Sequence, residues 1–386
     1  MLGNFLKLFI ILICLYSHTN LVMATTCGLT PSSTAKPDVF SVTLSGGLYA
    51  GQELPIGTTL YTLSTVRPSS STAVIECDGP TTITEVWTVI NEPSGQPFFQ
   101  PGTGLTGGMV YPTNVPGIGV ALLAASPSDI WVGQTFTQDK PNIVSFPITT
   151  SIDFKDMLGF QIRLIKTGDI PLGAVINGAS IPSISIYFDG APGDTGFPIE
   201  MQLASYAGSM NIYTRTCTTP DYEVAMGTYD AQRDFHGVGT TTQWVDASIN
   251  LENCPVFKGY NAEQWAWGSE PLIDMADTTG NLFKVELQPM TSIIDSSHGV
   301  FAVDDHVNGG GKATGVGIQM GYTETLNAAP TPPAKIWKPG RVWSIDIPKM
   351  SSGHLKIPLA ARYYQVNNKV KPGAADGSVV FTISYL

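Results

Sequence analysis

The sequence predicts an all-β protein with two domains, and three observations carry this prediction. The chain contains 40 glycines and 28 prolines, and long amphipathic helices do not survive such frequent interruption. Short segments that alternate apolar and polar residues recur between clusters of Gly, Pro and Ser, which is the pattern of half-buried strands. The length of 386 residues is long for one sandwich and suits two domains.

A first series of predicted strands occupies the N-terminal half of the chain. It covers residues 40–50, 58–66, 72–77, 82–90, 120–125, 129–136, 142–148, 160–168 and 183–188. The turn-rich stretch FDGAPGDTGFP ends this series, and ASYAGSMN at 204–211 is interpreted as a hinge. We therefore assign residues 25–207 to a first domain.

A second series of predicted strands follows in residues 208–386. It covers residues 211–217, 222–229, 242–254, 283–288, 299–303, 315–322, 341–348, 354–366 and 378–386. The Pro-rich segment AAPTPPAK at 328–335 is interpreted as a loop inside this second domain. Neither half shows an internal repeat.

The N-terminus has the features of a signal peptide. Lys7 precedes the apolar run LFIILICLY at 8–16, and VMA at 22–24 places small residues before a cleavage point. The alternative is a membrane anchor, but the apolar run is short for a bilayer span. We expect cleavage after Ala24 and export of residues 25–386.

Four cysteines remain after this cleavage, and an even number in an exported chain indicates two disulfides. Three pairings are possible. The long gap between Cys77 and Cys217 favours the local one, Cys27–Cys77 with Cys217–Cys254. A zinc site is the alternative, but no C-x-x-C motif is present.

The charge of the chain excludes two classes of partner. Acidic residues number 31 against 20 basic ones, giving a net charge of −11, and no cluster of Lys and Arg interrupts this acidity. Nucleic acid and anionic membranes are therefore poor partners.

Motifs for catalysis and cofactors are weak. GTGLTG at 102–107 fits G-x-G-x-x-G, but Pro101 precedes it where a strand is required, so we interpret it as a loop. The sequence Asp304-Asp305-His306 sits where a strand turns into NGGG, and a solvated turn is the simpler interpretation than a metal site. Neither G-x-S-x-G nor H-E-x-x-H occurs. We expect no cofactor, no metal and no enzyme activity.

The second half carries a more specific pattern. TRTCTTPDYEVAMGTYD at 214–230 is followed by the Cys254-Pro255 pair, by ATGVGIQM at 313–320, and by the terminal strand SVVFTISYL. Tyr385 is second from the end and Gly373 is fourteenth. Together these motifs resemble the pilin domains of bacterial fimbriae built by the chaperone–usher pathway. The stretch 256–297 and the Pro-rich loop are longer than that family leads us to expect.

The resemblance implies a fold and a set of partners. A pilin domain is an immunoglobulin-like β-sandwich that lacks its last strand, so its own final strand borders an open apolar groove. A periplasmic chaperone fills the groove during passage to the outer-membrane usher and grips the C-terminal carboxylate. A strand from the adjacent pilus subunit then replaces the chaperone strand. The residues expected at the groove are Gly373, Val379, Phe381, Ile383 and Tyr385.

The arrangement of a separate β-rich domain before a pilin domain is similar to the two-domain adhesins at the tips of type 1 pili. Only Thr25 and Thr26 would precede Cys27 after cleavage, so we expect this subunit to accept a strand and to donate none. The resemblance implies a cell-surface tip adhesin whose first, lectin-like domain binds a host glycan or glycoprotein. Two alternatives are a structural tip or adaptor subunit without ligand, and a secreted β-sandwich glycoside hydrolase.

The sequence does not identify a receptor pocket. Aromatic and amide side chains suited to sugars are present in the first half: Trp87, Tyr111, Asn114, Asp129, Trp131, Gln134 and Asn142. Trp87 and Trp131 lie inside alternating segments, which predicts core positions for both. The receptor-binding residues are therefore unknown at this stage.

Overall fold

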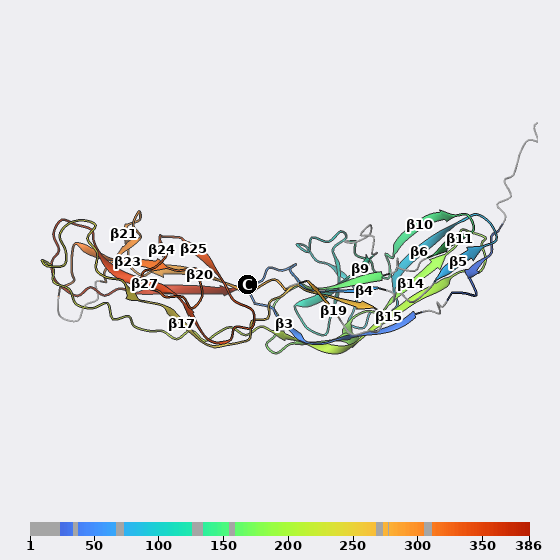
Figure 1. Ribbon diagram of the computed structural model, residues 1–386, viewed down its shortest axis with the longest axis horizontal. Coiled ribbons are helices and arrows are strands. Elements are labelled where there is room, and N and C mark those ends of the chain that lie inside the picture. The colour runs from blue at the N-terminus through green and yellow to red at the C-terminus, as the bar shows by residue number, and fades with distance from the viewer. Residues whose placement is uncertain are drawn as a thin grey trace, which may run out of the picture.

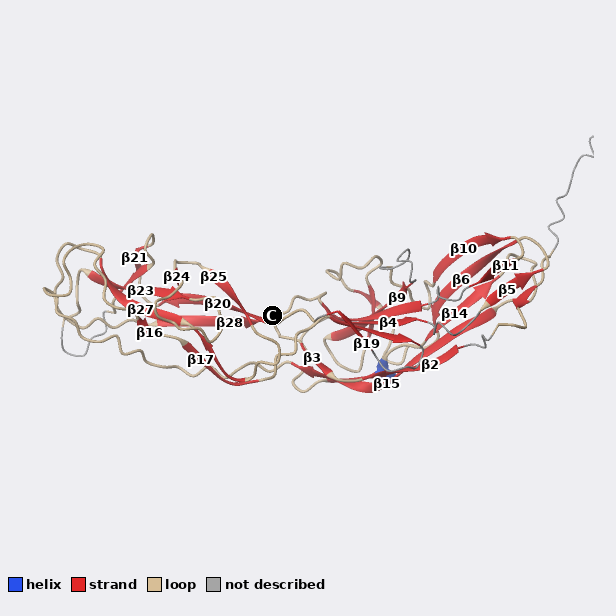
Figure 2. Cartoon of the chain, viewed as in Figure 1, coloured by secondary structure: helices blue, strands red, loops and turns tan. Residues whose placement is uncertain are grey.

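The computed structural model shows an elongated molecule with two β-rich bodies lying end to end and the C-terminus at their junction (Figures 1 and 2). It describes residues 24–33, 38–66, 73–125, 134–153, 159–267, 273–276, 278–304 and 311–386. Within these residues the regular structure is strand, apart from one 3-10 turn, η1 (Gly178–Ser180). The all-β prediction is confirmed. The predicted signal peptide, residues 1–24, lies outside the described residues except for Ala24.

The first body contains two large sheets and one small one. One large sheet has the order β10-β6-β14-β15-β13, and β2 and β3 run parallel to β15. The other includes β4-β12-β9-β8-β7, and the small sheet is β1-β5-β11. The bounds are β1 Cys27–Leu29, β2 Asp38–Leu44, β3 Gly47–Tyr49, β4 Thr59–Val66, β5 Val74–Cys77, β6 Thr81–Val89, β7 Phe98–Phe99, β8 Met109–Pro112, β9 Ile118–Ala125, β10 Asn142–Ile148, β11 Ser151–Asp153, β12 Gly159–Lys166, β13 Val175–Asn177, β14 Ile184–Asp189 and β15 Ile199–Tyr213.

The second body is also a sandwich of sheets. One sheet has the order β16-β27-β23-β22-β21 with β24 beside β23, another is β25-β20-β28, and β17 pairs with β26. The bounds are β16 Val245–Asp246, β17 Ile249–Cys254, β20 Leu282–Pro289, β21 Ile293–Asp295, β22 Val300–Ala302, β23 Val316–Tyr322, β24 Lys335–Ile336, β25 Val342–Asp346, β26 Gly353–Ile357, β27 Leu359–Gln365 and β28 Val379–Tyr385.

Each body has its own apolar core. In the first, alternate residues of the facing sheets meet around Trp87, which is buried and donates its indole N–H to the carbonyl of Gly159 at 2.9 Å. In the second, side chains such as Phe257, Phe283 and Trp343 form the centre. Burial of these side chains is the main stabilising term for both sandwiches.

The two bodies exchange segments of chain. Strands β18 (Ala262–Trp267) and β19 (Ile273–Ala276) follow Phe257 of the second core, yet β18 pairs in parallel with β4 of the first body and β19 pairs with β18. The predicted boundary between residues 207 and 208 does not anticipate this exchange. The predicted hinge at 204–211 is wrong, because these residues lie inside the continuous strand β15.

The disulfides follow the predicted pairing. Cys27–Cys77 joins the paired strands β1 and β5, and Cys217–Cys254 lies in the second core. Each bridge therefore crosslinks one body and leaves the junction free of covalent links other than the chain itself.

The long loops and weak motifs have structural roles. GTGLTG is a loop with no helix after it, and three of its glycines, Gly102, Gly104 and Gly107, have positive φ. Part of the Pro-rich loop covers β23, since a side chain at Gly321 would collide with Pro333. Asp304 is described, whereas Asp305 and His306 lie outside the described residues.

No described helix is long and apolar enough to cross a membrane. The described residues include no group of three or more His, Cys, Asp or Glu side chains arranged to hold a metal ion.

Candidate strand-acceptor site

Strand β28 is the edge of its sheet. It pairs antiparallel with β20 along its whole length, from Phe283 opposite Tyr385 to Pro289 opposite Val379. In the described part of the chain no strand pairs with its other side. An edge strand with unpaired N–H and C=O groups is a template for adding another strand.

The side chains of β28 alternate as the sequence predicts. Val379, Phe381 and Ile383 face the second core and remain only half buried, while Tyr385 is buried. Val380 and Thr382 face solvent. The fold therefore leaves a row of inward apolar side chains partly exposed along this edge, which is the kind of surface that a partner can cover.

Tyr385 is the best-packed residue of the row. Its ring stacks on Phe257 with 6.4 Å between centroids, and it meets the edge of Phe283 at 5.1 Å. Burial raises the pKa of the Tyr385 hydroxyl to about 12. Tyr385 therefore closes one end of the row inside the core, and the opening lies over Val379, Phe381 and Ile383.

A second unpaired segment runs along the other side of this opening. Residues 219–229 were predicted to include a strand, but within the described residues they form no main-chain ladder with any neighbour. Val224, Met226 and Tyr229 nevertheless pack against the second core, and the Tyr222 ring lies 6.4 Å from that of Phe381. The prediction of a strand at 222–229 is wrong, because the segment is not in strand conformation and pairs with no other described strand.

A cavity of about 340 Å³ lies beside residues 370–376, the segment of chain that leads into β28. Tyr229 and Phe235 contribute to its lining from one side, and residues 370–376 contribute from the other. Gly373 belongs to this lining; an added Cβ would approach the Gly311 carbonyl to 2.3 Å. The structure thus places Gly373 at the cavity rather than beside β28, and close backbone packing explains why glycine stands there.

The opposite end of β28 is docked on the first body. The main-chain N–H of Tyr385 donates to Oε2 of Glu53 at 3.2 Å, and Leu386 packs against the first core. An added Cβ at Gly51 would lie 2.1 Å from the Tyr385 carbonyl oxygen. Sequence reasoning missed Gly51 and Glu53, since nothing in the motif around them distinguishes this turn from others.

A buried lysine holds the turn that contacts Tyr385. The ammonium of Lys166 donates to the carbonyl oxygens of Gly51, at 3.2 Å, and Gln52. Burial lowers the pKa of Lys166. From the other direction, Tyr49 enters the second core and its N–H donates to the carbonyl of Gly259 at 3.0 Å. The junction is therefore a packed interface rather than a flexible linker.

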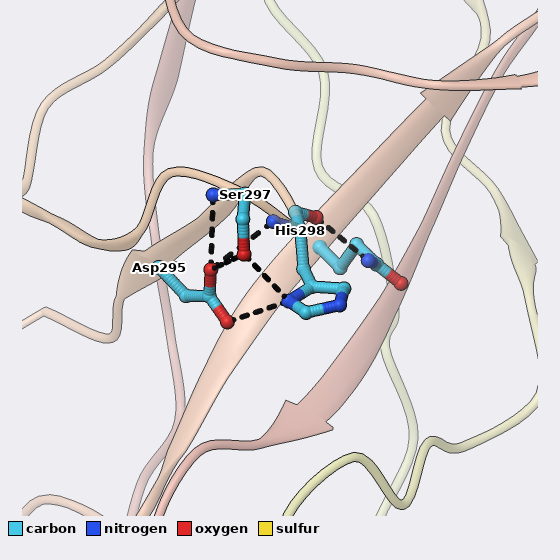
Figure 3. A network of polar contacts seen from close by, with 4 residues as sticks. Asp295, Ser297 and His298 are labelled. Atoms are coloured by element: carbon cyan, nitrogen blue, oxygen red, sulfur yellow. Dashed lines mark hydrogen bonds and ion pairs between the residues drawn. The ribbon is translucent and has the colours of Figure 1, made fainter.

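A cluster of Asp295, Ser297 and His298 combines the residue types of a hydrolytic triad (Figure 3). Asp295 Oδ2 and Ser297 Oγ both contact the same ring nitrogen, Nδ1 of His298, at 2.7 and 3.0 Å. A relay needs the two partners on different ring nitrogens. Asp295 also accepts the main-chain N–H groups of Ser297 and His298, so the cluster caps the turn between β21 and β22. Hydrogen bonds from the side chains of Ser297 and His298 lower the pKa of Asp295 to about 2.

The side chains suited to sugars in the first body do not gather into one site. Trp87 and Tyr111 are buried core residues, and Asn142 is buried in β10. Asn114 is engaged by the main-chain groups of Val175 and Asn177. Gln134 is exposed at an isolated bridge, and Asp129 and Trp131 lie outside the described residues.

Among curated proteins, a fimbrial protein matches along nearly the whole chain. No protein-family model matches. Over 356 residues the chain is 22% identical to a protein of Klebsiella pneumoniae described as a fimbria adhesin protein, covering 88% of this chain and 89% of the relative.

Two solved structures are also similar. They are the CupB6 tip adhesin from Pseudomonas aeruginosa (13% identity, TM-score 0.34, 92% of this chain and 93% of that chain) and the receptor binding domain of the plasmid-borne adhesin MrkD1P of Klebsiella pneumoniae (17% identity, TM-score 0.29, 51% of this chain and all of that chain, 100%).

Proposed function

We propose that this chain is a pilus tip adhesin anchored by strand complementation, which its C-terminal motifs and its 22% identity to a fimbria adhesin protein support. The second body is the pilin domain and the first body binds the host surface. One observation carries the anchoring part of the proposal. Among the described residues, the free edge of β28 and the unpaired segment 219–229 flank a half-buried apolar row. A single incoming strand would supply main-chain partners to both.

Strand addition explains the pattern of β28. Main-chain hydrogen bonds to the edge give affinity, and alternate side chains fit alternate positions of the groove. The incoming strand would cover Val379, Phe381 and Ile383 and extend toward the cavity that Gly373 lines. A periplasmic chaperone would provide this strand first, and an adjacent pilus subunit would provide it after passage through the usher.

Ligand binding by the first body is the second part of the proposal. We infer a host glycan or glycoprotein as the ligand from the relationship to adhesins. Such a subunit would stand at the fimbrial tip on the cell surface. No contact among the described residues favours the ligand-free adaptor or the glycoside hydrolase over this assignment.

The anchoring part is tested on the mature chain, residues 25–386. A strand of roughly ten alternating Val and Thr residues is joined after Leu386 by a Gly/Ser linker. We expect the added strand to raise the unfolding temperature of the second body by several degrees and to protect the β28 amides from hydrogen exchange. Identical melting and exchange with and without the strand would contradict the groove.

The location is tested by immunogold labelling of fimbriated cells. Label at fibre ends is expected, and even labelling along the shafts would refute the tip position. Cells that express a chain truncated before Val379 provide the control, because loss of β28 should remove the label altogether.

A further inference from the structure

The outward face of the sheet β18-β4-β12 carries a compact group of polar side chains and one tryptophan. The ladders place Glu263, Thr62 and Arg163 side by side across the three strands, and Trp265, Ser64 and Gln161 in the next row. We call these six residues the cross-strand cluster. The intervening residues Leu63 and Ile162 face the first core, so the cluster occupies the opposite face.

The rest of this face is apolar and covered. On the neighbouring β9 side, Val110, Ala121, Leu123 and Ile165 form a small closed cluster with Leu105 above it. The outward face is therefore apolar and covered over β9, and polar over β12, β4 and β18. A polar half that remains partly open to solvent is a candidate ligand surface.

The cluster consists of three buried side chains at its centre, called the floor, and three half-exposed ones around them. The two charged side chains among these, Arg163 and Glu263, are called its walls. Thr62, Ser64 and Gln161 are buried at the floor, while Arg163, Glu263 and Trp265 are half exposed around it. Arg163 and Glu263 stand on the two strands that flank β4, so their backbones are separated by two strand spacings, about 9.6 Å. No ion pair joins them, so neither charge is neutralised by direct contact with the other.

The protein orients both charged side chains. Gln161 donates to Ser64 Oγ at 2.9 Å, and its oxygen accepts the Nε–H of Arg163 at 2.7 Å. The indole N–H of Trp265 donates to Oε1 of Glu263 at 3.3 Å. Among the described residues, no acceptor bonds the terminal nitrogens of Arg163, so these donors remain available to a ligand.

The chemistry of the two walls selects the ligand. A guanidinium that donates and a carboxylate that accepts match adjacent hydroxyl groups, because each hydroxyl can accept one hydrogen bond and donate another. A carboxylate beside the site and an acidic chain disfavour an anionic group. We propose that the cross-strand cluster binds a neutral sugar residue of the host glycan, with hydroxyls held between Arg163 and Glu263.

This inference rests on the proposed glycan-binding function and adds its location. The proposed site is built from both halves of the sequence, because Arg163 lies on β12 and Glu263 on β18, which comes from the second half. The neighbouring strands β4, β9 and β19 are labelled in Figure 1. Residues 25–207 alone would lack one of the two walls.

The experiment is a glycan array with neutral and sialylated glycans, probed with the mature chain carrying the fused complementing strand. Glu263→Gln and Arg163→Lys are compared with Glu286→Gln and Arg233→Lys, which change exposed residues of the second body. We expect the wild type to bind neutral glycans. Each cluster variant should need at least about tenfold more protein for half-maximal binding, which corresponds to about 1.4 kcal/mol, and the controls should match the wild type.

The outcomes are distinguishable. Wild-type binding that both cluster variants retain would place the receptor site elsewhere and overturn this inference while leaving the proposed function intact. Binding restricted to sialylated glycans would overturn the neutral-sugar assignment. Failure of the wild type to bind any glycan would overturn the glycan-binding function and this inference together. If Arg163→Lys does not fold, Glu263→Gln decides, because the amide oxygen can still accept from Trp265.

Discussion

The main-chain nitrogen of Tyr385 donates a hydrogen bond to the carboxylate of Glu53 at 3.2 Å, although 332 residues separate them in sequence. This contact joins the strand that borders the open groove to the first body. Leu386, the next residue, packs against the first core and exchanges main-chain hydrogen bonds with Leu282. The groove and the domain junction therefore share the end of β28.

Gly51→Ala should disrupt the contact between the end of β28 and the turn that contains Glu53. The new methyl group would lie 2.1 Å from the Tyr385 carbonyl oxygen, so the turn or the strand end must move. Overpacking of this kind costs about 1–3 kcal/mol. Calorimetry should show a lower melting temperature, and the Tyr385 amide should exchange faster. Gly280→Ala is the control, because its added Cβ has no neighbour within 4 Å. Equal effects of the two substitutions would exclude close packing at Gly51.

The two faces of β28 should respond differently to substitution. Phe381→Ser and Ile383→Ser each remove an apolar group from the groove, and full burial of such a side chain is worth about 1.5–3 kcal/mol. We expect a complementing peptide to bind each variant about tenfold to a hundredfold more weakly by calorimetry. Thr382→Ser and Ser384→Ala change the outward face and should bind normally. Equal sensitivity of both faces would contradict the groove.

Removal of the second disulfide should destabilise the second body. Cys217 and Cys254 are separated by 37 residues, and the loop-entropy relation gives about 4 kcal/mol for a crosslink of this length. The Cys217→Ser/Cys254→Ser double variant should unfold at lower denaturant concentration. Cys27→Ser/Cys77→Ser should leave the second body's transition unchanged, since that bridge lies within the first body. A shift of both transitions in each double variant would show that the bodies unfold as one unit.

Glu85 should make the first body less stable as the pH rises. Its side chain is buried on the core face of β6, between Ile83 and Trp87 in the alternation, and burial raises its pKa to about 8. The unfolded chain loses this proton near pH 4.5, whereas the folded chain keeps it until about pH 8. Between these values the folded state binds more protons, so the free energy of unfolding falls with pH.

Glu85→Gln tests this dependence. The amide keeps the shape of a protonated carboxyl, so the variant should be more stable than the wild type at pH 7.5 and show a flatter pH profile in chemical denaturation. Glu76→Gln, at an exposed position of β5, should reproduce the wild-type profile. A wild-type stability that rises from pH 5 to pH 8 would disprove the role assigned to Glu85.

The sequence predicts the strands and the apolar face of β28 because alternation directly records which side chains are buried. It also predicts the disulfides, since each pair of cysteines lies within one series of strands. Alternation does not record main-chain pairing, however. Val224 and Met226 are spaced as on one face of a strand and pack against the second core, yet their segment has no partner strand among the described residues.

The parts that were missed depend on contacts between distant segments. The sequence AEQWAW at 262–267 resembles any short strand, and no local feature shows that it pairs in parallel with β4, about 200 residues earlier. The same limit applies to Glu53 and to the cross-strand cluster. Arg163, Gln161 and Glu263 have no motif in common, and only the register of β12, β4 and β18 brings them together.

The exchanged strands also determine how the molecule would carry a pulling force applied along its long axis. The chain crosses the junction three times: after β15, between Phe257 and β18, and between β19 and β20. Tension along the long axis would be shared among three covalent paths rather than one tether. It would load the β18–β4 ladder in shear, where its hydrogen bonds resist together instead of opening in sequence.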